Sequence, residues 1–327
     1  MIVAACVEPR NIPLSVPVRT TRSAWLAALM WGAMLFFLAP QGAASGEEIR
    51  HSFLATGPVF TGIIGEDGKT AWDAGRKGSR DGFVLPNGNI LITWANEVKE
   101  LTPEKKVVFH YAKSPENQEL STAQRLKNGN TLITELGAMP RLLEVAPDGK
   151  IAVEFALKPE TNNAHLQTRM ARKLKSGNYL APHLLAFKVK EYTPKGEVVQ
   201  EIRTDLEELG GRKIRNWPFT AIRLANGNTV IGCTLGHKVI ETDPQGKVVW
   251  SVSNDDLEGK PIDDACGVQR LPNGNTVITS HHARKGVKLL EVTRDKKIVW
   301  TYEGPHRIHH FQILTTNGKP LEGEPLK

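Results

Sequence analysis

A glycine-centred phrase recurs six times along the 327-residue chain, and this repeat constrains the fold more than any other feature. The phrase has the form Leu-x-Asn-Gly-Asn, with small departures in the third and sixth copies. The copies occupy residues 85–89, 126–130, 174–178, 224–228, 271–275 and 315–319. Their central glycines are 41, 48, 50, 47 and 44 residues apart, and a period of this length indicates a repeat architecture.

The residues around each phrase predict four short antiparallel strands. In the fourth unit, an apolar run at residues 221–224 leads into the Asn-Gly pair, which suits the positive φ angles of a tight hairpin. Three more apolar or β-branched runs follow at residues 229–231, 238–241 and 248–250, with a second tight turn before the last. Four such strands in about 46 residues describe one blade of a β-propeller.

The length of the chain sets the number of blades. Residues 46–327 are 282 residues, which at about 46 per unit gives six blades. Five units are complete, and the sixth is divided between the two ends of the repeat. Residues 62–72 carry its third and fourth strands, residues 310–314 carry the first, and the segment after Gly318 is a candidate for the second. Joining these parts closes the ring and hides strand edges that an open β-solenoid would leave unpaired.

We therefore predict an all-β fold, a single six-bladed β-propeller of four-stranded antiparallel blades over residues 46–327. Residues 1–45 lie outside the repeat and have the order of a signal peptide. Arg19 and Arg22 precede an apolar run at residues 24–40, and small residues follow at 42–45. The run has 17 residues, whereas a membrane span needs about 20, so cleavage is favoured over a retained anchor. We expect an exported protein that is periplasmic, secreted or at the cell surface.

The charge balance limits the partners. The whole chain carries a formal charge of +7, and residues 1–45 contain three basic residues and one acidic residue, which leaves +5 for the rest. This mild excess without a Lys/Arg run does not suit nucleic acid. We expect a monomer without a stable membrane span after cleavage, with a small-molecule, carbohydrate or peptide ligand, and a slight preference for an anion.

Several motifs resemble known families. The turn-and-strand phrases at residues 67–72, 245–250 and 296–300 each end in Trp and resemble the Trp-docking repeat of quinoprotein (PQQ-type) propellers. The phrase Leu-Pro-Asn-Gly-Asn-Thr at residues 271–276 is similar to one in arylsulfotransferases. With residues 215–218 and 263–267, the chain most resembles exported PQQ-like propellers of unassigned function. Three blades replace the docking Trp by Phe109, Phe155 and Gln200, so PQQ is not expected as a cofactor.

The strand order predicts two unlike faces. One face carries the near-identical tight turns, and the other carries the irregular loops between second and third strands and between blades, where binding usually resides. Eight histidines fall in or beside these loops. The first strand of each blade begins at this second face and lines a central funnel, where polar groups from separate blades converge on one candidate site. The candidate ligand-binding residues are Arg80, Asp81, Gln167, Arg169, His183, Asn216, Trp217, Asp263, Asp264, Cys266, His281 and His282, and the candidate catalytic residues are His165, His309 and His310.

Three kinds of chemistry fit these residues. His165, His309 or His310 together with Asp263 or Asp264 could ligate a divalent metal. A histidine could instead act as nucleophile or general base while Arg80 and Arg169 hold an anion, as the loose similarity of the His309-His310 pair to arylsulfotransferases implies. In the third and preferred hypothesis there is no catalysis, and Trp94 and Trp217 stack on a sugar or peptide.

The function predicted first is therefore ligand binding in the funnel. An enzyme on the same scaffold is the alternative, followed by a ring that serves only protein interaction.

Two cysteines remain after residue 45, Cys233 and Cys266. They can form one disulfide in an oxidising compartment or pack as small apolar side chains, and Cys266 can be reactive only if its pKa is lowered.

Overall fold

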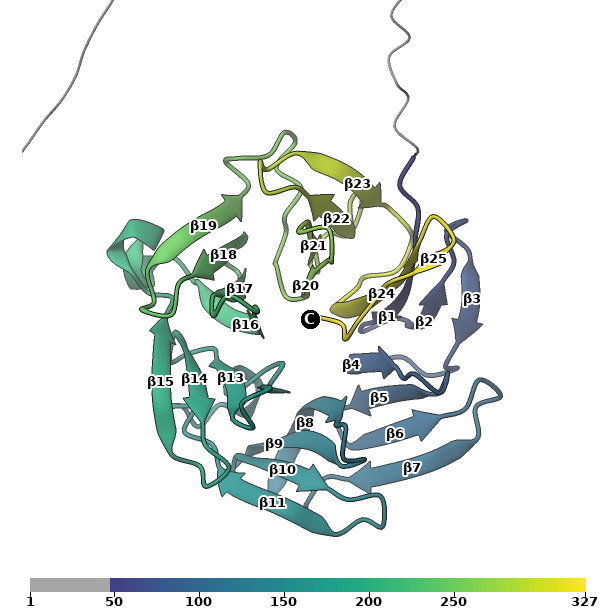
Figure 1. Ribbon diagram of the computed structural model, residues 1–327, viewed down its shortest axis with the longest axis vertical. Coiled ribbons are helices and arrows are strands. Elements are labelled where there is room, and N and C mark those ends of the chain that lie inside the picture. The colour runs from purple at the N-terminus through teal and green to yellow at the C-terminus, as the bar shows by residue number, and fades with distance from the viewer. Residues whose placement is uncertain (1–47) are drawn as a thin grey trace, which may run out of the picture. The chain divides into compact units, whose positions relative to one another are not determined.

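Six antiparallel sheets surround a central axis in the computed structural model, which describes residues 48–327 (Figure 1). The predicted all-β, six-bladed propeller is confirmed. The predicted signal peptide at residues 1–45 lies outside the described residues. Blades 1 to 5 follow one another along the chain, and the sixth combines strands from both ends of the described part.

The blades have simple antiparallel order, from the axis outwards. Blade 1 is β4 (Ser79–Val84), β5 (Ile90–Trp94), β6 (Glu97–Leu101) and β7 (Val107–Ala112). Blade 2 is β8 (Asn117–Arg125), β9 (Thr131–Gly137), β10 (Arg141–Val145) and β11 (Ile151–Ala156). Blade 3 is β12 (Arg172–Lys173), β13 (Tyr179–His183), β14 (Lys188–Tyr192) and β15 (Val198–Arg203). Blade 4 is β16 (Trp217–Arg223), β17 (Thr229–Thr234), β18 (Lys238–Thr242) and β19 (Val248–Ser253). Blade 5 is β20 (Val268–Arg270), β21 (Thr276–Thr279), β22 (Leu289–Val292) and β23 (Ile298–Tyr302).

The sixth blade closes the ring, with the order β25 (Lys319–Pro320), β24 (His310–Thr316), β1 (His51–Thr56), β2 (Thr61–Ile64) and β3 (Thr70–Asp73). The third and fourth strands lie where the sequence predicts them. The second strand is β1, so the segment after Gly318 was the wrong candidate for it. That segment contributes only β25, which pairs with Thr315 and Thr316 on the other edge of β24. Pro320 has no N–H with which to extend the pairing.

The hydrophobic core lies between neighbouring blades, because each sheet is covered on both faces by the next. One cluster joins Val230 and Val239 of blade 4 to Ile278 and Leu290 of blade 5, and all four side chains are fully buried. The second strands of most blades are buried along their whole length and the third strands over most of it, whereas the outermost strands alternate mainly between partly buried and exposed side chains. This pattern explains the continuous apolar runs in the middle of each repeat.

The repeated phrase forms the turn between the first two strands of a blade. In blade 1 the N–H of Leu85 donates to the carbonyl of Asn89 at 2.8 Å, and Gly88 adopts φ +83°. Glycine tolerates this left-handed conformation without steric cost, which explains why it is retained at this place in the repeat.

The second asparagine of the phrase has a further role that the sequence analysis missed. In blade 4, the Asn228 side chain donates to Glu241 of the third strand at 2.9 Å, and Arg270 of the next blade donates to the same carboxylate at 3.0 Å. Five blades repeat this inter-blade joint. Each joint consists of an asparagine, a glutamate and a basic residue or histidine: Asn89–Glu100–Arg125, Asn130–Glu144–Lys173, Asn178–Glu191–Arg223, Asn228–Glu241–Arg270 and Asn275–Glu291–His51.

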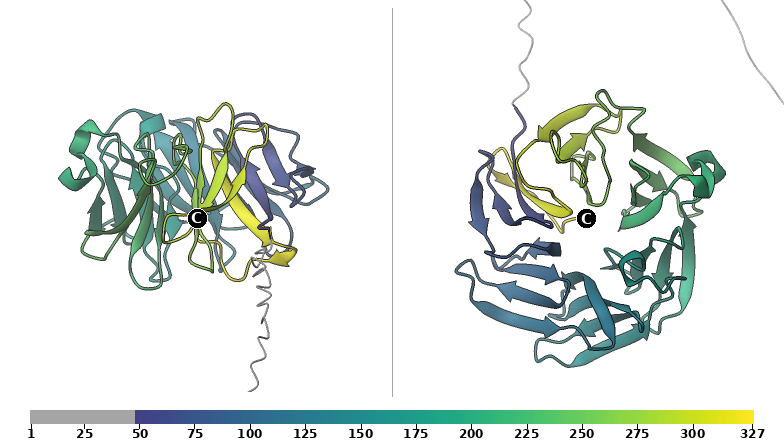
Figure 2. Two further views of the ribbon diagram at one scale, coloured as in Figure 1. Left: turned by 90° about the horizontal axis from the view of Figure 1, so that it is seen from above. Right: turned by 180° about the vertical axis from the view of Figure 1, so that it is seen from behind.

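The turns and loops that connect the strands lie on the two opposite faces of the ring (Figure 2). The described part contains three 3-10 helices, η1 (Ala164–Leu166), η2 (Glu207–Leu209) and η3 (Gly211–Lys213), all in connections between blades. We call their side the loop face and the side of the glycine turns the turn face. Among residues 48–327, no helix is long and apolar enough to cross a membrane.

Candidate functional site

The candidate residues divide into two groups with different surroundings. One group lies at the loop-face end of the axis, and we call it the loop-face cluster. It consists of Arg80, Glu119, His165, Arg169, Phe219, His281, His282 and His309. The second group lies deeper, and we call it the axial core. It consists of Asp81, Thr122, Arg172, His310 and Lys327.

Glu119 is the charged centre of the loop-face cluster. Its carboxylate lies 2.6 Å from the Arg80 guanidinium, 3.1 Å from that of Arg169 and 3.4 Å from Nδ1 of His165. Burial alone would raise the pKa of Glu119, but the hydrogen bond from His165 and the two guanidinium groups outweigh it and lower the pKa to about 2. Glu119 is therefore ionised at neutral pH and shared by two arginines.

Arg169 is fully buried beneath this carboxylate. Its guanidinium also donates to the backbone carbonyls of His165 and Thr168 and lies 5.9 Å from the centre of the Phe219 ring. Burial lowers the pKa of Arg169 to about 10, against the opposing effect of Glu119, so the side chain remains charged at neutral pH. Arg169 thus joins the charged part of the cluster to its aromatic part.

His309 projects a ring nitrogen that no described residue binds. Its Nδ1 lies 3.2 Å from the Arg80 carbonyl oxygen, which can only accept, so Nδ1 carries the proton and Nε2 carries a lone pair. The ring lies edge-on to Phe219 and His281, each with 4.8 Å between centroids. Burial, His281 and the nearby arginines hold the pKa of His309 well below its usual range. The imidazole is therefore neutral, and its Nε2 is able to accept a hydrogen bond.

His281 repeats this arrangement next to His309. Its Nδ1 lies 3.1 Å from the Ile308 carbonyl oxygen, and burial lowers its pKa to about 4. The Arg307 guanidinium approaches its Nε2 at 3.5 Å. His282 follows in the chain, is about 45% exposed, and lies 3.3 Å from the carboxylate of Asp264. The loop-face cluster thus contains neutral imidazoles beside fixed charges.

Asp264 and Cys266 pack beside the cluster in the connection to β20. Oδ1 of Asp264 accepts hydrogen bonds from the Thr234 hydroxyl and from the Leu235 N–H, and lies 3.4 Å from the Cys266 sulfur. Burial first, and then the Asp264 charge, raise the pKa of Cys266 well above its usual value. Cys233 is also buried, and neither thiol forms a disulfide in the described part of the chain. Cys266 is consequently a protonated packing residue at neutral pH.

Asp81 and His310 face the axial core, away from their chain neighbours Arg80 and His309. The Asp81 carboxylate lies 3.0 Å from Arg172, 3.1 Å from Lys327 and 3.2 Å from His310. Burial opposes its ionisation, but Arg172 and Lys327 hold the pKa of Asp81 well below its usual range. Burial lowers the pKa of His310 to about 3 and that of Lys327 to about 7. This core ties strands of several blades together near the axis.

Several other candidates are engaged in the fold. His183 is fully buried and bonded to the Thr168 hydroxyl at 2.9 Å and to the Tyr192 hydroxyl at 2.8 Å. Burial lowers the pKa of His183 to about 3. The buried Asn216 side chain donates to the Leu209 carbonyl at 3.0 Å. These contacts occupy both ring nitrogens of His183 and the amide nitrogen of Asn216.

The aromatic and acidic candidates differ in access. Trp217 is half-buried and packs against an apolar cluster that includes Phe219 and Cys266. Trp94 is buried, with the Arg76 guanidinium 4.5 Å from its ring centre, so it offers no free face for stacking. Asp263 is exposed and presents its carboxylate to solvent.

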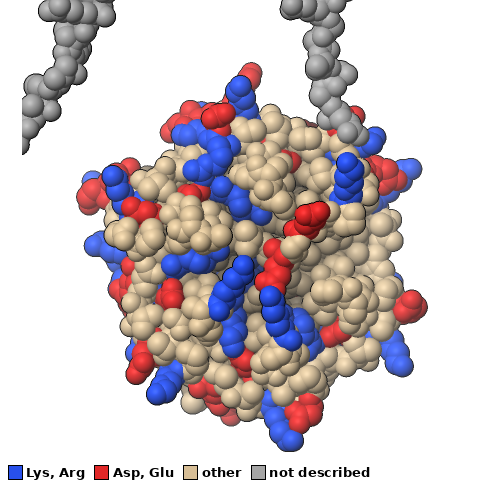
Figure 3. All heavy atoms as spheres, in the orientation of Figure 1, with Lys and Arg blue, Asp and Glu red and all other residues tan. Residues whose placement is uncertain are grey.

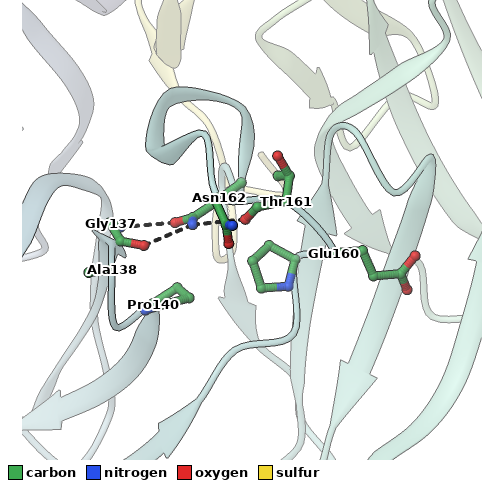
Figure 4. A pocket seen from close by; sticks show the side chains of 8 residues that line it. Gly137, Ala138, Pro140, Glu160, Thr161 and Asn162 are labelled. Atoms are coloured by element: carbon green, nitrogen blue, oxygen red, sulfur yellow. Dashed lines mark hydrogen bonds between the residues drawn. The ribbon is translucent and has the colours of Figure 1, made fainter.

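Gln167 lies in a separate pocket between blades 2 and 3 (Figure 4). Its amide group donates to the Gly137 carbonyl and accepts from the Gly137 N–H, both at 2.9 Å, which fixes one wall. The pocket has a volume of about 320 Å³. Its lining consists of Gly137, Ala138, Pro140, Pro159, Glu160, Thr161, Asn162 and Gln167. The segment 159–162 belongs to an irregular connection, and none of its residues is among those predicted for the site.

The geometry of the described residues does not support the predicted divalent metal site. Within residues 48–327 no group of three His, Cys, Asp or Glu side chains is placed to hold a metal ion. His165 pairs with Glu119, and His310 is part of the axial core.

The structure also adds Glu119 and Phe219 to the predicted set of site residues. Phe219 packs in the same cluster as Trp217, two residues before it, but a register shift between Pro218 and Thr220 interrupts the alternation that could have predicted this. Glu119 was missed because β8 begins as early as Asn117 and contains register shifts that the sequence pattern does not reveal.

The fold and the loop-face cluster define a six-bladed β-propeller with a polar, histidine-rich site at one end of its axis. The family model of Mal s 1 allergenic protein-like proteins matches residues 15–273, and the chain belongs to this family. A comparison with curated proteins finds no match.

Solved structures share the fold at low sequence identity. A protein of unknown function from Bacteroides caccae is 23% identical over 80% of this chain and 98% of its own, with a TM-score of 0.69. A streptogramin B lyase is 13% identical over 81% of this chain and 90% of its own, with a TM-score of 0.56. The virginiamycin B lyase of Staphylococcus aureus is 13% identical over 76% and 85%, with a TM-score of 0.53.

Proposed function

We propose that this protein is an exported β-propeller that binds a small-molecule or short polymeric ligand at the loop-face cluster. The observation that carries the proposal concerns the ring of His309. Its Nδ1–H donates a hydrogen bond to the Arg80 carbonyl oxygen, and its Nε2 has no hydrogen-bond partner among the described residues. Neutral imidazoles, guanidinium groups and a half-buried Trp217 lie together at the end of the axis. Such convergence of polar and aromatic groups from several blades is typical of a binding site.

Two further considerations support this proposal. The export signal is inferred from the order of basic, apolar and small residues within positions 1–45. Among the fold neighbours, one structure is that of a catalytically inactive histidine-to-alanine variant of virginiamycin B lyase with quinupristin. The same architecture thus accepts a small molecule in another protein, although that likeness concerns the fold alone.

A ligand screen with matched variants tests the proposal. Compounds that raise the melting temperature of the full chain are titrated by calorimetry into the wild type and into His309→Ala and Arg80→Gln. We expect each substitution to weaken binding by at least about tenfold, equivalent to about 1.4 kcal/mol. The control is Lys195→Ala in an exposed turn-face loop, which should bind as the wild type does. Ligands that bind both loop-face variants with unchanged affinity would place the site elsewhere and refute the proposal.

The second candidate is group transfer through His309, favoured by the lone pair on its Nε2 and by the positive charges of Arg80 and Arg169 that act on the ring. In the arylsulfotransferase-like version, Nε2 attacks the sulfur of an aryl sulfate, the phenolate leaves, and a second phenol then takes the sulfuryl group. The assay follows release of nitrophenolate from nitrophenyl sulfate in the presence of phenol. His309→Gln should lower the rate by about 100-fold or more. A wild-type protein without turnover, or a variant with full activity, would exclude this candidate.

A further inference from the structure

The loop-face cluster has an apolar side as well as a charged side. Met170, Phe219 and Cys266 are buried together at the ends of blades 3, 4 and 5. Leu166 and Trp217 pack against them and remain partly exposed. Their exposed surfaces are therefore available at the same end of the axis as the histidines.

The charged side has an excess of positive groups. Arg80 and Arg169 share the single carboxylate of Glu119, so one of the two guanidinium charges is not balanced there. Arg307 lies beside His281, facing the ring from the connection between blades 5 and 6. The carboxylate of Asp264 contacts His282 and the backbone N–H of Leu235, and its charge also acts on His281.

A guanidinium also lies close to the apolar side. The Arg215 guanidinium is 5.8 Å from the centre of the Trp217 ring. Phe219 links the two sides, because its ring contacts His309 edge-on and lies under Arg169. Apolar surface, positive charge and an unpartnered hydrogen-bonding atom are thus within one continuous set of contacts.

We propose that the ligand of this site is a small organic anion with a flat apolar body, such as an aromatic carboxylate. Its acidic group would lie beside the guanidinium of Arg80, and its ring would lie against Leu166 and Trp217. This inference rests on the proposed function and adds the chemical class of the ligand. Guanidinium groups favour carboxylates because their donors match the two carboxylate oxygens.

Calorimetry with four compounds that differ in one property each tests the class. Phenylacetate has both features, 2-phenylethanol lacks the charge, phenethylamine reverses it, and acetate lacks the ring. Phenylacetate should bind the full chain with a Kd of about 1 mM or tighter, and each of the others at least about tenfold more weakly.

Variants test which residues bind the acidic group of the ligand and which bind its ring. Trp217→Ala should reduce phenylacetate binding about tenfold. Arg80→Met should abolish the preference for phenylacetate over phenylethanol. Arg80→Lys keeps the positive charge and should retain part of this preference. It also serves as the second variant if Arg80→Met disturbs folding. Lys195→Ala is the control and should behave as the wild type does. Melting curves of every variant verify that the fold persists.

The outcomes separate this inference from the proposed function. If phenethylamine or phenylethanol binds as tightly as phenylacetate and His309→Ala weakens that binding, the site stands and the anionic class is wrong. Acetate binding as tightly as phenylacetate would overturn the apolar half of the inference. If none of the four compounds binds, the anion class is overturned, and the ligand screen with His309→Ala still decides the site itself.

Discussion

Neighbouring residues at the starts of the inner strands serve different parts of the molecule. Arg80 and His309 belong to the loop-face cluster, whereas the adjacent Asp81 and His310 bind Lys327 in the axial core. Burial without partners would be costly for the Asp81 carboxylate, so the surrounding cations are needed to keep it charged. Apart from the buried Arg169 and Phe219, the loop-face residues keep some solvent access, which is the condition for binding a ligand.

Glu119 should make stability depend on pH. Its pKa is about 2 in the folded protein against 4.5 as the ordinary value, so its ionised form stabilises the fold above pH 4.5. This contribution, about 3 kcal/mol, is lost as pH falls from about 4.5 to about 2.

The test is urea unfolding of the wild type and Glu119→Gln at several pH values. The difference in free energy of unfolding should be largest at pH 7 and should shrink through that acidic window. The exposed Glu258→Gln serves as control and should show no such trend. A difference that stays constant down to pH 3 would contradict the assignment.

Between blades, the recurring element is the joint of asparagine, glutamate and a basic side chain. It connects the glycine turn of one blade to the next blade through a partly or fully buried carboxylate, and the partner residue lies on the inner strand in four joints and on β1 in the fifth. The outer strands add a second connection, because Trp72 and Trp250 donate to turn carbonyls of the following blade, each at 2.8 Å. Gln200 makes the same contact at 2.7 Å, so a docking position without Trp still bridges two blades.

Breaking one joint should destabilise the whole ring. Glu241→Ala removes the partner of Arg270, which is buried, and of Arg294. We expect a loss of about 3 kcal/mol, since an uncompensated charge is left in the interface between blades 4 and 5. Urea unfolding at pH 7 measures this, with Glu258→Ala on the surface expected to change stability by less than about 0.5 kcal/mol. Equal stability of the two variants would show that the joint contributes nothing.

Residues 48–327 form a ring whose last blade is joined by hydrogen bonds between β24 and β1. Residues far apart in the chain meet there, since His310 pairs with Thr56 and Thr316 with His51. Charges of both signs are interspersed on the face seen in Figure 3. The ring, rather than any single blade, is therefore the unit that folds, because every sheet needs two neighbours to bury its faces.

Two truncations test this closure. A protein that begins at residue 48 retains every strand of the described ring and should fold cooperatively as a monomer, as judged by circular dichroism melting and gel filtration. One that begins at residue 58 lacks β1, which leaves edges of β24 and β2 unpaired. It should aggregate or lose the cooperative transition. Cooperative unfolding of the shorter protein at an unchanged temperature would mean that the closing strand is dispensable.

The fold was largely predictable because its signal is local and repeated. A glycine turn and flanking β-branched runs specify a hairpin wherever they occur, so the repeat at residues 85–319 identified the blades and their number. The second strand of the last blade was placed wrongly, since β1 carries no copy of the phrase and only its partner β24 defines it.

The site was predictable as a region and not as a set of contacts. The sequence by itself determined that irregular loops and histidines gather on one face of a six-bladed ring. Only the tertiary structure decided that Glu119 holds two arginines, that His183 is bonded on both ring nitrogens, and that His309 keeps one nitrogen free. The physical reason is that turns depend on neighbours in the chain, whereas burial and ion pairing depend on residues brought together from separate blades.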